Sequence, residues 1–250
     1  MITSNIQKGG ALLADARRLV EIWDLRVDAS ANMNRVVQEN LLAKTSRART
    51  QDVLNRILRP RLVDPGPHVI AALKELVNVP RGFVDAYYFE ATRADQLLAA
   101  FSEGPLFGWW EDGRLAVDVD LVVGWLGRTA TQGDLPVWTD SVRRKVARGL
   151  LAAVRDFGIL VGRVRKEFSK PSISLAGFGY VAYRLHESGE SSRALLGSRV
   201  WRRWLLDNDR VTQMFNEAAR SGLLHYSSAG SAVRVDWIQS SLSEVVRAVA

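Results

Sequence analysis

The sequence predicts a mainly α-helical fold made of helix-turn-helix or winged-helix-like units with one or two small β-hairpin wings. Three observations predict it. Apolar residues recur at helical spacing along most of the 250 residues. Two strongly basic segments each carry a helix whose apolar and cationic faces are opposed. Residues 223–237 alternate on both sides of a Ser-Ser-Ala-Gly-Ser turn, as a β-hairpin does.

The first half of the chain is a series of helical patterns divided by polar turns. Residues 64–67, Asp-Pro-Gly-Pro, are expected to turn because proline fixes φ and glycine tolerates positive φ. Residues 104–114, rich in glycine and containing a proline, are expected to form a loop. Helices are predicted over residues 11–25, 32–42, 50–62, 69–77, 82–101 and 116–128.

The second half contains the most regular helical pattern, residues 139–157, which Thr139 can cap and Gly158 can end. Residues 159–168 then favour a short strand of a basic wing. The break in pattern near residues 158–175 divides the chain into an N-terminal helical domain, 1–165, and a C-terminal winged-helix-like domain, 166–250. Further helices are predicted over residues 172–188, 191–196, 211–221 and 238–250.

Composition excludes several classes of protein. Hydrophobic residues make up 47% of the chain, which is too many for a disordered protein. The absence of cysteine excludes disulfides, thiolate metal sites, iron–sulfur clusters and a cysteine nucleophile, and it suits a reducing cytoplasm. No apolar run approaches the roughly 18 residues of a membrane-spanning helix. We therefore expect a soluble, cytoplasmic protein that does not enter a membrane.

Charge is distributed unevenly. The net charge is +7, and 28 of the 34 basic residues are arginine. Residues 31–62 carry seven basic and two acidic side chains, residues 80–138 carry four and nine, and residues 139–170 carry nine and three. A GC-rich genome also raises arginine content. Arginine is nevertheless the side chain best suited to phosphate and guanine, because its planar fork donates two parallel hydrogen bonds.

The first basic segment, residues 33–62, is typical of a helix-turn-helix: a helix, a short polar turn and a second helix. Thr50 is expected to cap the second helix. Four apolar residues between Val53 and Leu58 then share one face, with arginines opposite. From this segment we predict DNA contacts by Lys44, Ser46, Arg47, Arg49, Thr50, Arg56 and Arg59.

The second basic segment repeats this design on one helix, with an apolar face that includes Val146, Leu150 and Val154. Solvated arginines on an amphipathic helix are common, so either segment alone also fits a plain surface helix. Two segments of similar layout favour the interpretation that they bind DNA. From this helix we predict DNA contacts by Thr139, Ser141, Arg143, Arg144, Lys145 and Arg148.

Residues for catalysis, cofactor binding or metal binding cannot be assembled from this sequence. His68, His186 and His225 are far apart and lack ligand spacing. The phosphate-binding loop motif and the nucleophile-elbow motif are absent, and Asp118 and Asp120 suit a surface role. Residues 201–206, Trp-Arg-Arg-Trp-Leu-Leu, either meet phosphate or anchor a connecting segment, with the second interpretation favoured.

Three stretches resemble the BrxA family of BREX phage-exclusion systems: residues 34–62, residues 79–93 and residues 139–160. The shared pattern is Asn40-Leu41 at the end of one helix, a Ser/Thr turn from Thr45 to Thr50, Arg61-Leu62 at the end of the second helix and a Thr-capped basic helix from Thr139. The resemblance covers about residues 9–237. It implies a small helical or winged-helix, non-enzymatic protein that binds double-stranded DNA in a phage-defence operon.

The leading hypothesis is a sequence-tolerant double-stranded DNA-binding protein, accessory to a larger defence complex and in contact with other defence-system proteins. A second is a protein–protein adaptor that uses the acidic middle and the tryptophans. A third is a winged-helix transcriptional regulator that uses the C-terminal hairpin. An enzyme is the least favoured class.

Overall fold

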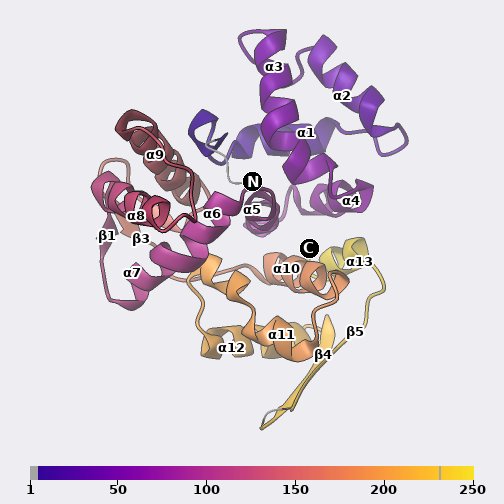
Figure 1. The fold of residues 1–250 in the computed structure, drawn as a ribbon. Coiled ribbons are helices and arrows are strands. Elements are labelled where there is room, and N and C mark those ends of the chain that lie inside the picture. The colour runs from indigo at the N-terminus through magenta and orange to yellow at the C-terminus, as the bar shows by residue number, and fades with distance from the viewer. Residues whose placement is uncertain (1–4, 231) are drawn as a thin grey trace. The chain divides into compact units, whose positions relative to one another are not determined.

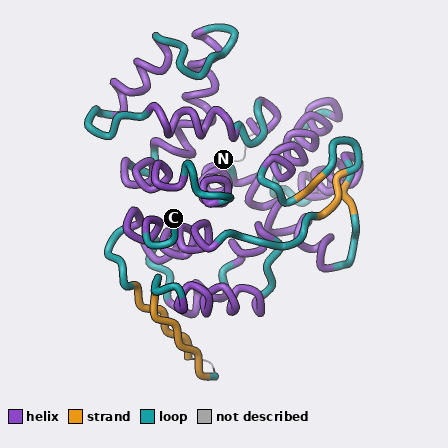
Figure 2. Tube along the Cα trace, turned by 180° about the vertical axis from the view of Figure 1, so that it is seen from behind, coloured by secondary structure: helices purple, strands orange, loops and turns teal. Residues whose placement is uncertain are grey.

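The protein is mainly helical, as predicted, with two small antiparallel sheets (Figures 1 and 2). The computed structural model describes residues 5–230 and 232–250, without the side chain of Lys8. Among these residues, no helix is both long enough and apolar enough to cross a bilayer.

Contacts between Cα atoms divide the chain into two compact units, each assembled from several segments. Unit 1 comprises residues 1–13, 91–172 and 199–205, and unit 2 comprises residues 14–90, 173–198 and 206–250. The two predicted basic segments therefore belong to different units. The predicted division into folding domains at residue 165 stays a prediction.

Unit 2 begins with helices separated by tight turns. Asp28 caps the second of them, and α4 begins at Pro67, the last residue of the predicted turn. Gly66 has φ +112°, which favours glycine. The helices are α1 (Leu13–Ile22), α2 (Ala29–Gln38), α3 (Arg47–Val53), the π-helix η2 (Leu54–Val63) that continues α3, α4 (Pro67–Leu76) and α5 (Gly82–Ala94), inside which the boundary between the units falls.

The C-terminal part of unit 2 surrounds α10 (Leu175–Glu187), most of which is buried. In this helix Arg184 and the Tyr180 hydroxyl both donate to the buried Glu90 carboxylate, at 3.0 and 2.8 Å. The Asp85 carboxylate accepts from the Ser174 backbone N–H and hydroxyl. The remaining elements are α11 (Ser192–Gly197), α12 (Asn208–Arg220), the predicted hairpin of β4 (Leu224–Ala229) and β5 (Ala232–Trp237), and α13 (Leu242–Arg247).

Unit 1 contains the 3₁₀-helices η1 (Asn5–Lys8) and η4 (Arg199–Trp204) and a run of elements from residue 96 to residue 168. Helices α8 and α9 pack side by side (Figure 1). The run consists of α6 (Gln96–Phe101), the π-helix η3 (Ser102–Leu106), α7 (Phe107–Glu111), β1 (Ala116–Val117), α8 (Val119–Thr131), α9 (Asp140–Asp156), β2 (Leu160–Val161) and β3 (Lys166–Phe168).

The three strands of unit 1 form one antiparallel sheet in the order β1-β3-β2. Val117 faces Lys166, and Leu160 faces Phe168. The element order from α7 onward is therefore helix, strand, helix, helix, strand, strand, with the central strand last in sequence.

Two local predictions were wrong. Residues 104–114 were expected to form a loop, but η3 and α7 occupy most of this stretch, because Pro105 is accommodated in a π-helical turn. Residue 116 was expected to begin a helix, but residues 116 and 117 form β1, and Asp118 caps α8 by accepting from the Leu121 backbone N–H.

Candidate nucleic-acid interface

Helix α9 separates an apolar face from a cationic face, as its sequence predicts. The Thr139 hydroxyl oxygen caps it by accepting from the Val142 backbone N–H at 3.4 Å. The apolar face, from Val146 to Phe157, is buried in unit 1. Ser141, Arg144, Lys145 and Arg148 are exposed. The helix therefore presents its cations to solvent.

Three arginines on α9 have carboxylate partners: Arg155 pairs with Asp156 near the end of the helix, and the other two were predicted to contact DNA. Arg144 pairs with Asp120 of α8 at 2.8 Å, and both side chains are at least half exposed, 51% and 78%. Arg143 is mostly covered and pairs with Asp140 at 2.9 Å. Exposed pairs of this kind contribute about 0–1 kcal/mol, so a phosphate can compete for the arginine. For the described part of the chain, no ion pair joins Lys145 or Arg148 to a carboxylate.

The hairpin that follows α9 adds further cations to the same unit. Gly158 ends the helix in the left-handed region, φ +81°. Between β2 and β3, the chain turns through Gly162–Arg165, where Arg163, Val164 and Arg165 are exposed. Arg165 pairs with Glu167 at 3.2 Å, and both of these side chains are exposed. Residues 159–168, expected to hold one short strand of a basic wing, instead form two short strands, β2 and β3, and the cationic turn between them.

The turn between α2 and α3 is held by one asparagine. The Asn40 amide donates to the Lys44 carbonyl at 2.8 Å, and its side-chain oxygen accepts from the Lys44 N–H and the Thr50 hydroxyl. Thr50 was expected to cap α3 and to contact phosphate. The expected cap is wrong: Ser46 is the cap, accepting from the Arg49 N–H, and Thr50 is buried within the helix, which disfavours the predicted phosphate contact.

The cations of this first basic segment are largely paired with carboxylates. Asp52 accepts from both Arg49 and Arg56, at 3.1 and 2.6 Å. Arg59 pairs with Asp64 at 2.9 Å, and Lys44 pairs with Asp15 of α1 at 2.6 Å. Arg47 is exposed, and no carboxylate among the described residues forms an ion pair with it. The positive electrostatic potential at this segment is therefore weaker than its number of basic residues suggests.

Arg61 and Leu62, the last pair in the pattern that resembles the BrxA family, have a structural role. Both residues are buried, and Arg61 donates to the Tyr87 hydroxyl at 3.0 Å. Burial raises the pKa of the Tyr87 phenol above its usual range. Arg61 therefore does not reach the surface.

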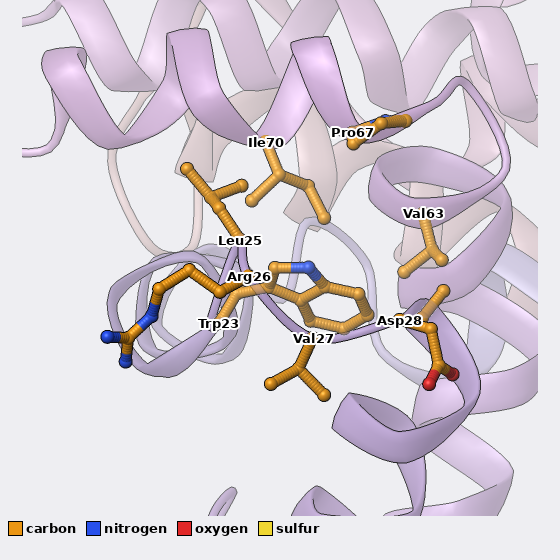
Figure 3. Close-up of a pocket in the computed structure, with 9 residues that line it drawn as sticks. Trp23, Leu25, Arg26, Val27, Asp28, Val63, Pro67 and Ile70 are labelled. Carbon is orange, nitrogen blue, oxygen red and sulfur yellow. The ribbon is translucent and has the colours of Figure 1, made fainter.

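Unit 2 also holds a cavity of about 340 Å³ that the sequence analysis did not identify. Figure 3 shows the Trp23 indole between Ile70 and Val27, with the Arg26 guanidinium pointing away from it. Arg26 binds Asp24 instead, and these hydrogen bonds hold the pKa of the Asp24 carboxyl well below its usual range. Leu25 and Val27 at the rim are exposed. The residues that line the cavity are mostly apolar.

Residues 201–206 anchor a connecting segment, the interpretation that the sequence favoured. Arg203 is buried in unit 1, where it pairs with Glu103 at 2.6 Å and donates to the Thr92 hydroxyl. Arg202 lies over the Phe107 ring, 4.9 Å from its centroid. Trp201 and Trp204 are buried.

The three histidines lie in different surroundings. His68 lies 3.4 Å from the Arg184 guanidinium, and His186 packs against the rings of Tyr183 and Trp237. His225 is exposed on β4.

Comparisons with known proteins give a family and a fold. A family model described as BrxA matches residues 3–182. No curated protein matches the chain significantly. A solved structure described as an uncharacterized protein from Magnetospirillum magneticum is similar with a TM-score of 0.63 and 18% identity, and the match covers 81% of this chain and 97% of that one. At that identity the likeness concerns the fold alone.

Proposed function

Because the chain belongs to the BrxA family of BREX phage-defence systems, we propose that it is a non-enzymatic accessory protein that binds double-stranded DNA mainly through the phosphate backbone. Its dependence on base sequence is small. Phosphate contacts by arginine and lysine supply a sequence-independent affinity that falls with salt.

One observation supports this proposal: the exposed cationic face of α9 lies within an order of elements that is compatible with a winged helix. From α7 to β3 the order is helix, strand, helix, helix, strand, strand, with sheet order β1-β3-β2. In helix-turn-helix proteins the second helix of the pair lies in the major groove. Here that helix is α9, and Arg144, Lys145 and Arg148 are its exposed cations.

The first basic segment takes a secondary part in the proposal. Four of its cations are paired with Asp15, Asp52 or Asp64, so a phosphate contact by any of these four must displace an ion pair. Exposed pairs are weak enough for this exchange, but the net gain per contact is smaller. Arg47 and Ser46 at the start of α3 are the most available contacts there.

The double variant Arg144→Glu, Arg148→Glu tests the proposal, with Arg18→Glu, Arg193→Glu as a control that reverses two exposed arginines elsewhere. In mobility-shift titrations on two unrelated duplexes, we expect the first variant to weaken binding at least about tenfold on both, because two phosphate contacts become repulsive. The control is expected to change affinity much less. Equal effects of the two variants would move the DNA site away from α9.

A protein–protein adaptor is the second candidate, and the cavity beside Trp23 favours it. An apolar cavity of about 340 Å³ rimmed by exposed Leu25 and Val27 is suited to an apolar side chain of a partner. Binding of a defence-system protein that persists at high salt and is lost in Trp23→Ala, with no DNA shift at any salt, would support the adaptor and contradict the DNA proposal.

A further inference from the structure

The tip of the β2–β3 hairpin has a fixed turn. Leu160 faces Phe168 and Val161 faces Glu167, so Gly162–Arg165 connect the strands. Gly162 has φ +93°, and a Cβ there would lie 2.2 Å from the Arg165 carbonyl oxygen, so only glycine fits. The Lys166 ammonium donates to the Arg163 carbonyl at 3.2 Å.

The tip combines an exposed apolar side chain with two exposed arginines. Val164 is 98% exposed, and an exposed arginine precedes and follows it. Among the residues that the structure describes, Glu167 is the one carboxylate that forms an ion pair with these arginines; it pairs with Arg165 and is itself exposed. The tip is therefore a narrow, cationic projection with an apolar point.

A narrow minor groove is complementary to such a projection. A·T-rich tracts narrow the minor groove and deepen its negative potential, which attracts inserted arginines. The groove floor offers the acceptors adenine N3 and thymine O2, and guanine N2 adds a donor that opposes a guanidinium. An apolar side chain between two arginines can contact the sugar walls.

We propose that the Gly162–Lys166 tip enters the minor groove of duplex DNA and gives the protein a preference for A·T-rich tracts. The proposal rests on the DNA binding proposed above and adds the groove and the shape that are read. The tip follows α9 directly in the same unit, so a duplex held by α9 in its major groove would have its neighbouring minor groove available to the hairpin. Phosphates bound by α9 supply affinity, and the tip supplies the preference.

The test uses the full chain and two duplexes of equal length that differ only in a central A·T or G·C tract. We expect the wild type to bind the A·T duplex about fivefold more tightly. A minor-groove ligand such as netropsin should remove this difference. Arg163→Gln, Arg165→Gln should abolish the preference while the G·C duplex is still bound, and Arg18→Gln, Arg193→Gln should retain it. Circular dichroism confirms that each variant is folded.

The outcomes separate the two proposals. DNA binding with equal affinity for both duplexes, or a preference that survives in Arg163→Gln, Arg165→Gln, would overturn the minor-groove contact and leave the proposed function intact. Absence of a shift on either duplex at low salt would overturn both. If the tip contacts a protein partner instead of DNA, the protein should bind both duplexes with equal affinity.

Discussion

The Thr50 hydroxyl of α3 donates a hydrogen bond to the side-chain oxygen of Asn40, which lies in the turn that joins α2 to α3. Asn40 itself has φ +47°, a left-handed conformation that asparagine tolerates better than most residues. Thr50 thus stabilises the turn from inside the helix.

Replacing Thr50 with valine tests this role. Thr50→Val keeps the shape and removes the donated hydrogen bond, so we expect the free energy of unfolding to fall by about 1 kcal/mol. Urea denaturation measures this free energy of unfolding. DNA affinity should stay within about twofold, since a buried hydroxyl makes no phosphate contact. Lost DNA binding with unchanged stability would restore Thr50 as a contact residue.

Removal of the acidic partner of Arg144 should strengthen DNA binding. Asp120→Asn releases the arginine from its 2.8 Å ion pair and deletes a negative charge beside α9. We expect affinity at low salt to rise about threefold. Asp112→Asn, an exposed carboxylate after α7 with no ion pair to α9 among the described residues, is the control and should change affinity less. Unchanged binding by Asp120→Asn would mean that Arg144 does not reach DNA.

A pair of glycine variants tests the packing of α9 in unit 1. A Cβ on Gly149 would lie 2.7 Å from the Ile6 carbonyl oxygen of η1, whereas a Cβ on Gly124 of α8 would meet only the end of the Arg128 side chain at 3.4 Å. We expect Gly149→Ala to destabilise the protein by about 1–3 kcal/mol and Gly124→Ala to stabilise it by about 0.5–1 kcal/mol. Thermal and urea unfolding measure both. A stable Gly149→Ala protein would show that η1 does not pack on α9.

Arg202 and Arg203 of η4 should behave differently on mutation. Arg203→Met leaves Glu103 without its 2.6 Å partner in a mostly buried position, so we expect a loss of about 3–5 kcal/mol. Arg202→Ala removes a cation–π contact with Phe107 and should cost about 0.5–1 kcal/mol. Equal losses in urea denaturation would contradict the anchoring role of Arg203.

Periodicity predicted the mainly helical character of the fold and the elements with strong local signals. The pattern from Thr139 to Gly158 and the alternation on both sides of the C-terminal turn specify their structures locally, and α9 and the β4–β5 hairpin match them. Residues 104–114 could not be predicted in this way, because glycine and proline usually end helices, whereas Pro105 here lies in a π-helical turn.

The candidate site was only partly predictable. The ion pairs of Asp52 with Arg49 and Arg56 follow helical i,i+3 and i,i+4 spacing and were open to prediction from sequence. The pairs Lys44–Asp15 and Arg144–Asp120 join residues on different helices, so they depend on packing that sequence spacing does not specify. The choice of Ser46 over Thr50 as the cap likewise depends on the Asn40 turn.

The salt dependence of DNA affinity tests the central claim most directly. If about six phosphates are engaged, the slope of log affinity against log salt should be near −5. Mobility-shift or fluorescence-anisotropy titrations of the wild type from low to moderate salt should give this slope on two unrelated duplexes. An affinity that does not change over that range would contradict binding through phosphates.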